Sequence, residues 1–228
     1  MTEIDPDTLL KGPRVAPRNP RTTALVILLH GYGADGNDLA GLAGPLAGVL
    51  PGAAFRAPNA PEICRVNRGG RQWFPIPWID GASEQEMMVS FSAAVDLLDR
   101  YVTAAMAAEG VGPAQTALVG FSQGTMMSLH VAPRRPQPVA GVVGFSGRLL
   151  VGERLGAEMK SKPPVLLVHG DRDDVIPVAA LEATRQGLAS AGVEVIAHVS
   201  PGTPHGIAPD GLGLAASFLR EKLGTAVG

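Results

Sequence analysis

The stretch Gly120-Phe121-Ser122-Gln123-Gly124 decides the fold. It follows the apolar run at residues 116–119 and precedes a helix-forming segment at residues 125–131. A strand, a serine between two glycines and a helix, in this order, are typical of a nucleophile elbow, whose turn is too tight for side chains at the glycines. Such a turn exposes the serine hydroxyl beside the positive N-terminal end of the helix. The alternative, a glycine-rich turn with an idle serine, does not account for both flanking elements.

Composition favours one soluble domain. The chain of 228 residues is long enough for a single domain with a sizeable core, and no internal repeat is visible. A net charge of −2 gives no electrostatic case for binding nucleic acid or an anionic membrane. Cys64 is the only cysteine, so no intramolecular disulfide can form. Residues 1–7 hold no apolar segment of a secretory signal, and the aliphatic runs are too short for stable membrane insertion, so we expect a cytoplasmic protein.

Apolar runs that alternate with helical patterns predict an α/β fold with a mostly parallel central sheet and helices on both faces. Buried strands are expected at residues 24–29, 116–119, 139–145 and 164–168, a further short strand at residues 53–56, and a last strand of alternating polarity at residues 193–199. The clearest helix begins at a capping box in residues 83–86 and ends at Gly110. Four prolines exclude a long helix near the N-terminus. We therefore predict a single domain over residues 1–228, in which residues 1–21 are a loose lead-in with room for one short edge strand.

Three further expectations concern helix caps and a long loop. Asp38 is a candidate N-cap for a helix that Pro45 should break or kink, and Asp210 is a candidate N-cap for the last helix. Residues 57–82 are predicted to be a long loop, which in a compact domain is usually functional or an insertion. The loop carries the bulky residues Trp73, Phe74 and Trp78. Together with Phe121 of the elbow they could wall an acyl pocket, or the loop residues could form a satellite core.

A serine nucleophile requires a base, and the base requires an acid that orients it. After an elbow serine, the acid comes next in the chain and the histidine last. His205 follows the last predicted strand in a Pro/Gly-flanked loop and is therefore the candidate base. The other histidines lie within or at the end of predicted elements and are interpreted as structural: His30, His130, His169 and His198.

Spacing alone does not identify which aspartate is the acid. Asp171, Asp173 and Asp174 all follow the strand at residues 164–168, and neighbours on one turn cannot be separated by position. Two of them, Asp171 and Asp174, would also serve as hydrogen-bonding residues of an Asx-type turn. A second serine, Ser146, follows a strand as well, but Arg148 stands where an elbow needs its second glycine. We interpret Ser146 as a turn residue.

Four motifs together resemble the phospholipase/carboxylesterase family of small α/β-hydrolases, which includes the acyl-protein thioesterases. They are His30-Gly31-Tyr32-Gly33, the elbow, His169-Gly170-Asp171-Arg172-Asp173 with Val175-Ile176-Pro177, and Pro204-His205-Gly206. The resemblance covers nearly the whole chain from about residue 24. It implies an α/β-hydrolase fold without a large lid domain, Asp173 as the acid and His205 as the base. It also implies that the backbone N–H groups of Tyr32 and Gln123 bind the oxyanion.

Together these patterns predict a serine carboxylesterase that cleaves small or medium-chain acyl esters through an acyl-enzyme on Ser122. One alternative is an acyl-protein thioesterase or lysophospholipase with the same triad. Another is a non-catalytic binding protein of this fold, against which the complete set of triad residue types argues. No zinc-type ligand cluster and no dinucleotide or P-loop fingerprint is visible, so no metal or cofactor is expected. The expected partner is a small-molecule ester, and the oligomeric state stays open, a homodimer being one alternative.

Overall fold

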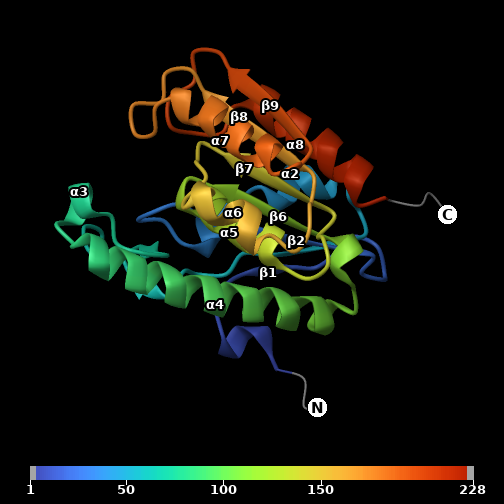
Figure 1. Cartoon of the computed structure of the whole chain (residues 1–228). Coiled ribbons are helices and arrows are strands. Elements are labelled where there is room, and N and C mark those ends of the chain that lie inside the picture. The colour runs from blue at the N-terminus through green and yellow to red at the C-terminus, as the bar shows by residue number, and fades with distance from the viewer. Residues whose placement is uncertain (1–3, 225–228) are drawn as a thin grey trace.

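A seven-stranded sheet forms the centre of the computed structural model, which describes residues 4–224. The strand order is β1-β3-β2-β6-β7-β8-β9, and β1 is the one strand that runs antiparallel to its neighbour (Figure 1). The strands are β1 (Arg14–Val15), β2 (Ala24–Leu29), β3 (Ala53–Arg56), β6 (Thr116–Phe121), β7 (Gly141–Phe145), β8 (Val165–Gly170) and β9 (Val195–Ser200). The predicted, mostly parallel sheet is therefore confirmed.

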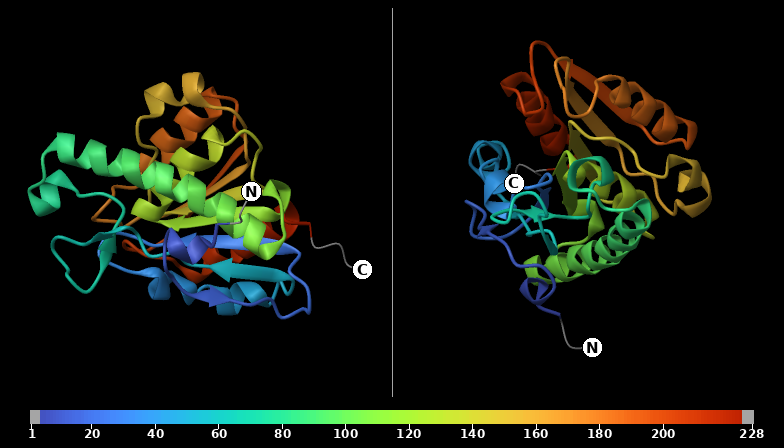
Figure 2. Two further views of the ribbon diagram at one scale, coloured as in Figure 1. Left: turned by 90° about the horizontal axis from the view of Figure 1, so that it is seen from below. Right: turned by 90° about the vertical axis from the view of Figure 1, so that its left-hand side faces the viewer.

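Helices cover both faces of this sheet (Figure 2). One face packs against α4 (Glu84–Glu109), α5 (Gln123–Arg134), α6 (Leu155–Glu158) and α7 (Ala179–Ser190). The other packs against α1 (Gly36–Ala40), α2 (Ala43–Ala47) and α8 (Pro209–Lys222). Short 3-10 helices are η1 (Pro6–Thr8), η2 (Pro113–Gln115) and η3 (Gly152–Arg154). No large lid domain is present in residues 4–224, and no helix there is long and apolar enough to cross a membrane.

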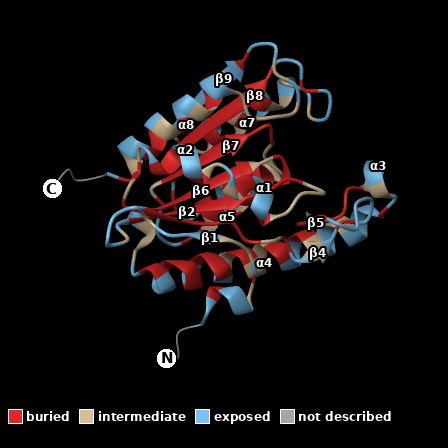
Figure 3. Cartoon of the chain, turned by 180° about the vertical axis from the view of Figure 1, so that it is seen from behind, coloured by how far each residue is buried: buried red, intermediate tan, exposed pale blue. Residues whose placement is uncertain are grey.

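Strand β2 shows why the apolar runs are continuous. Leu25, Ile27 and Leu29 point into the core beside α4 and α5. The alternate residues of the strand, Val26 among them, point into the core beside α1, α2 and α8. Every residue of β2 is buried, as Figure 3 shows for the central strands. A strand covered on both faces needs apolar side chains at each position rather than at every second one.

The capping box that begins α4 is confirmed. The Ser83 hydroxyl accepts a hydrogen bond from the Glu86 amide (3.2 Å), and the Glu86 carboxylate accepts one from the Ser83 amide (2.8 Å). Gly110 ends the helix with a φ of 66°, a left-handed conformation that glycine adopts at low cost. Both ends of this 26-residue helix are therefore fixed by local sequence.

The other predicted caps are wrong. Asp35, not Asp38, caps α1, because its Oδ1 accepts hydrogen bonds from the amides of residues 37 and 38. Ala208 precedes α8 as its N-cap, and Asp210 instead accepts a hydrogen bond from His198 Nε2 at 2.7 Å. The break expected near Pro45 exists, but it lies earlier, between α1 and α2. Pro45 stands in the first turn of α2, where its missing N–H is tolerated.

The N-terminal lead-in is tied to the body of the protein rather than loose. β1 pairs with the edge of β3, as the expected edge strand. The guanidinium groups of Arg14 and Arg56 both donate to Glu109 at the end of α4, with Nε–Oε1 distances of 2.7 Å. The Glu109 side chain is 1% exposed, so this is a buried ionic network. Residues 1–3 of the lead-in lie outside the described residues.

Residues 57–82, predicted as a long loop, contain a hairpin and a short helix. The hairpin pairs β4 (Glu62–Ile63) with β5 (Arg71–Gln72), and the helix is α3 (Pro77–Asp80). The hairpin is bonded to the loop after β2. The Gly33 amide donates to the Arg71 carbonyl (2.8 Å), and the Arg71 amide donates to the Ala34 carbonyl (2.7 Å). This segment therefore helps to fix the loop that follows His30.

Candidate active site

Ser122 lies at the strained turn between β6 and α5. Its φ is 53° and its ψ −115°, a conformation that L-residues rarely adopt. A Cβ atom at Gly120 would overlap the Gly124 backbone, and one at Gly124 would overlap the carbonyl oxygen of Leu29. The two glycines are therefore required for the turn to close against β2. This is the geometry of a nucleophile elbow.

Asp173 and His205 are brought together at the same edge of the sheet, from the loops after β8 and β9. His205 Nδ1 lies 2.7 Å from Asp173 Oδ2. The other carboxylate oxygen, Oδ1, accepts hydrogen bonds from the amides of Val175 (3.0 Å) and Ile176 (2.8 Å). Asp173 is thus fixed by its own turn, while Asp171 and Asp174 are exposed and make no side-chain hydrogen bond in the described part of the chain.

The electrostatics of Asp173 favour its charged form. Burial raises the pKa of the carboxyl, but the hydrogen bonds from the Ile176 amide, His205 and the Val175 amide outweigh it, so that the pKa lies below its ordinary value of 3.8. A carboxylate that accepts from Nδ1–H fixes the tautomer of His205 and leaves Nε2 free to accept a proton. His169 also approaches this carboxylate, with Nε2 at 3.2 Å from Oδ2.

Two backbone amides predicted as oxyanion donors border the same space. Tyr32 and Gln123 line one cleft with Ser122. Neither amide N–H donates to another group in the described part of the chain. A Cβ atom on Gly31 would lie 3.3 Å from the Cβ of Ser122, so the loop after β2 packs directly on the elbow. Free N–H groups beside a serine are the arrangement that stabilises an oxyanion.

The cleft that holds these groups has a volume of about 310 Å³. Both Ser122 and His205 line it. Most of its remaining wall is apolar, and the other lining residues are Ile76, Trp78, Ile79, Met126, Arg148, Val175, Ile176, Pro177 and Ala180. Trp78 stands on α3 and lines this cleft, with 70% of its surface exposed. Of the four aromatic residues predicted to bind substrate, Trp78 alone lines this cleft.

The other three aromatic residues do not line this cleft, and for Trp73 and Phe74 the structure agrees with the alternative of burial in the core. Trp73 is fully buried, and its indole Nε1 donates to the carbonyl of His30 at 3.0 Å. Phe74 is buried edge-on against Phe91, with ring centroids 5.3 Å apart. Phe121 packs against the His205 ring, with centroids 4.9 Å apart, and faces a separate hollow.

The Gln123 side chain binds the backbone of residues 73 and 74. Its side-chain Oε1 accepts from the Trp73 amide (3.1 Å), and its Nε2 donates to the Phe74 carbonyl (2.8 Å). The Gln123 side chain is fully buried and so bonds the long loop to the start of α5. This second function of Gln123 follows from contacts between residues about fifty positions apart, which no local pattern could reveal.

Arg148 is a site residue that sequence reasoning missed. In the sequence it serves only as the residue that stands where an elbow at Ser146 would need its second glycine. Ser146 is indeed a buried turn residue, with a φ of 44°, and no helix follows it directly. The sequence signal that could have identified Arg148 is its position, because it follows β7, the strand beside the elbow strand β6. In residues 4–224 no group of three His, Cys, Asp or Glu side chains is arranged to hold a metal ion.

The chain is similar to known proteins over nearly its whole length. The sequence profile of the phospholipase/carboxylesterase family matches residues 10–223. Acyl-protein thioesterase 1 of Gibberella zeae is 28% identical over 225 residues, covering 93% of this chain and 96% of its own. Esterase YpfH of Escherichia coli is 29% identical over 199 residues, covering 87% and 83%. The crystal structure of esterase PE8 superposes with a TM-score of 0.89 at 42% identity, covering 94% of this chain and 99% of that one.

Proposed function

Because the chain belongs to the phospholipase/carboxylesterase family of hydrolases, we propose that it cleaves carboxylic esters through an acyl-enzyme on Ser122. One observation carries the proposal. His205 lines the cleft beside Ser122, while its Nδ1 lies 2.7 Å from the charged, backbone-bonded Asp173. The shared cleft and the bond between His205 and Asp173 support the roles of nucleophile, base and orienting acid for these three residues.

In the proposed reaction the Ser122 oxygen attacks the acyl carbonyl, and His205 Nε2 takes the hydroxyl proton. The carbonyl oxygen becomes an oxyanion that the amides of Tyr32 and Gln123 stabilise. When the tetrahedral adduct collapses, His205 returns the proton to the leaving alcohol, and the acyl group remains on Ser122. Water then attacks the acyl-enzyme with His205 as base, and the carboxylic acid is released. Asp173 stabilises the imidazolium formed in each half of the reaction.

We propose small or medium-chain esters as substrates. A volume of about 310 Å³ lies at the lower end of ligand pockets in general, and the wall is mostly apolar. Thioesters are a second candidate class, which the name of the Gibberella zeae relative favours. The same steps would release a thiol in place of an alcohol. Matched esters and thioesters of graded acyl length, including a lysophospholipid, would rank these classes by kcat/KM.

Labelling by a fluorophosphonate probe tests the proposal. The probe reacts with an activated serine, so the wild-type protein should be labelled and Ser122→Ala should not. Ser146→Ala is the matched control, because Ser146 is buried outside the cleft and should leave labelling unchanged. A wild-type protein that resists the probe, although folded, would instead be a non-catalytic binding protein of this fold.

A further inference from the structure

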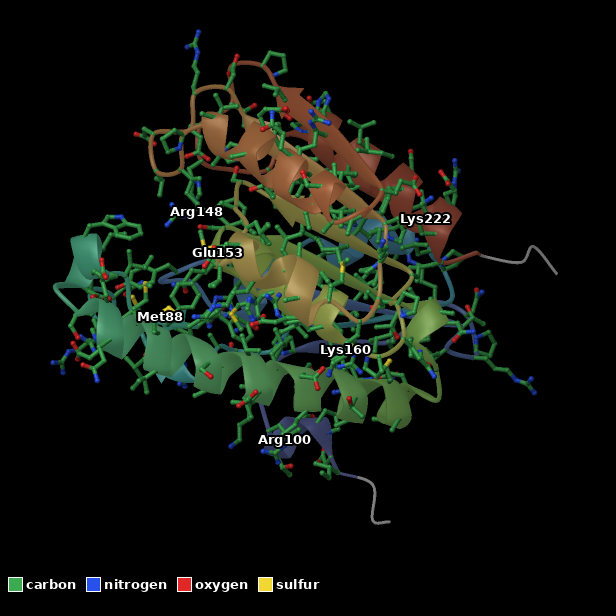
Figure 4. The ribbon with its side chains drawn as sticks, viewed as in Figure 1. Met88, Arg100, Arg148, Glu153, Lys160 and Lys222 are labelled. Atoms are coloured by element: carbon green, nitrogen blue, oxygen red, sulfur yellow. The ribbon has the colours of Figure 1, made fainter. Side chains whose placement is uncertain are left out.

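Arg148 is the one permanently charged side chain among the described residues that line the cleft. It leaves the loop after β7 and extends toward α3 (Figure 4). Its guanidinium carbon lies 5.6 Å from the centre of the Trp78 ring. A cation–π contact with an aromatic face positions a guanidinium and leaves its N–H groups available for hydrogen bonds. The charge is therefore presented to the same space as Ser122 and His205.

This guanidinium has no anionic partner in residues 4–224. No carboxylate there lies within ion-pair distance of it, although six other arginines of the chain make such pairs. Glu153 belongs to the same loop region, but it is exposed and lines a different hollow. The Asp173 carboxylate is already hydrogen-bonded to His205 and to backbone amides and makes no ion pair with Arg148. A half-buried charge without a counter-ion loses hydration that an anionic ligand could replace.

We propose that Arg148 binds a carboxylate carried by the substrate, so that the preferred substrates are small esters with a free carboxylate. This inference rests on the proposed esterase function and names its substrate class. Arginine forms two parallel hydrogen bonds with a carboxylate, which fix the orientation of the ligand as well as its charge. The rest of the wall is apolar and suits a short methylene chain between the carboxylate and the scissile bond. The carboxylate could belong to the acyl group or to the alcohol.

Two matched pairs of substrates separate these sources. Monomethyl succinate carries the carboxylate on the acyl group, and methyl succinamate is its neutral counterpart of similar shape. Acetylglycolate carries the carboxylate on the alcohol, and acetylglycolamide is its neutral counterpart. For each pair the measured quantity is the ratio of kcat/KM for the charged ester to that for the neutral one. The pair whose ratio depends on residue 148 identifies the side on which the carboxylate is bound.

The test compares wild-type protein, Arg148→Gln and the control Arg154→Gln. Arg154 is a neighbouring arginine that lines other hollows, so its loss removes the same charge from outside the cleft. Arg148→Gln should lower the charged-to-neutral ratio by at least about tenfold for one pair, the usual effect of a charge-assisted hydrogen bond. Arg154→Gln should leave the ratio as in wild type. If Arg148→Gln slows charged and neutral esters equally, Arg148 only supports Trp78 and the inference is wrong.

A binding measurement keeps this test independent of turnover. In a Ser122→Ala background, calorimetry can compare the Kd of each charged ester before and after Arg148→Gln. A Kd at least about tenfold weaker for one charged ester and unchanged for its neutral counterpart supports the inference. Equal Kd values before and after the change overturn it. Should the wild-type protein hydrolyse no ester, the proposed function fails, and this comparison still decides whether Arg148 binds the carboxylate.

Discussion

At the scale of single residues, the two oxygens of Asp173 have different functions. Oδ1 is used by the turn that follows β8, and Oδ2 is used by His205. The turn function was expected for Asp171 or Asp174. One carboxylate therefore both forms the turn and binds His205, so the direction of the imidazole is set by the backbone of the turn.

Asp173→Asn should lower kcat on a simple ester by about 10⁴, because an amide cannot hold the required tautomer of the histidine. Asp174→Asn should change kcat little, since its side chain is exposed and makes no hydrogen bond in residues 4–224. Steady-state kinetics on both variants, with circular dichroism to verify folding, would check the ranking. The opposite ranking would assign the acid to Asp174.

Ser122 combines the hydroxyl proposed as the nucleophile with an unfavourable backbone conformation. Ser122→Ala should reduce kcat by several orders of magnitude and leave the thermal midpoint near that of wild type, because alanine keeps the strain. Ser122→Gly should be equally inactive but more stable by about 1 kcal/mol, because glycine adopts a φ of 53° without a Cβ clash. Urea unfolding would measure the difference. More than about a hundredth of wild-type kcat in either variant would exclude Ser122 as nucleophile.

At the scale of elements, Glu109 joins three segments that are distant in the sequence. It ends α4 and binds Arg14 of β1 and Arg56 of β3. The antiparallel edge strand is therefore held by a charge on a helix as well as by its strand partner. Such a network does not follow from hydrophobic periodicity, which explains why the lead-in was expected to be loose.

Glu109→Gln should lower the free energy of unfolding by about 3 kcal/mol, because it leaves the buried Arg56 guanidinium with only the exposed Asp7 carboxylate, 3.3 Å away, as counter-charge. Glu182→Gln is the matched control, since Glu182 forms an exposed pair with Arg185 on α7 and its loss should have little effect. Urea titration of both variants at neutral pH measures the two changes. Equal losses of unfolding free energy in the two variants would mean that the buried network stabilises the fold no more than an exposed ion pair does.

At the scale of the whole molecule, stability should fall in acid. Burial raises the pKa of Glu109, but its hydrogen bonds and ion pairs with Arg14 and Arg56 outweigh this, so that its pKa lies below its ordinary 4.5. The pKa of Asp173 lies below its ordinary 3.8 for a similar reason, because its hydrogen bonds outweigh its burial. A carboxyl with a depressed folded-state pKa stabilises the fold above its ordinary pKa, and this contribution disappears as the pH falls through the lowered value.

The free energy of unfolding should therefore decrease as the pH falls from about 5 to below 4. Urea titrations across this range would follow the decrease. Glu109→Gln should show a shallower decrease than wild type, because one of the contributing carboxyls has been removed. Parallel pH profiles for the two proteins would show that Glu109 titrates alike in the folded and unfolded states.

Much of the molecule could be predicted from sequence because its signals are local. Continuous apolar runs located the strands, and Ser83 with Glu86 located the start of α4. The positions of Ser122 and His205 followed from the order of strands and loops. The predictions that failed concern residues whose place depends on contacts between distant segments. Trp73, for example, is buried and its indole N–H donates to the carbonyl of His30, forty-three positions away.

The glycines of the elbow have a consequence for mutagenesis. Any replacement of Gly120 or Gly124 introduces a Cβ where backbone atoms already lie. In a library screened for catalysis, both codons would therefore be as intolerant as the codon for Ser122. A screen for activity alone would count all three as one functional class. Cellular abundance would divide them, because substitutions of Ser122 leave a folded but inactive protein, whereas substitutions of either glycine deplete the protein itself.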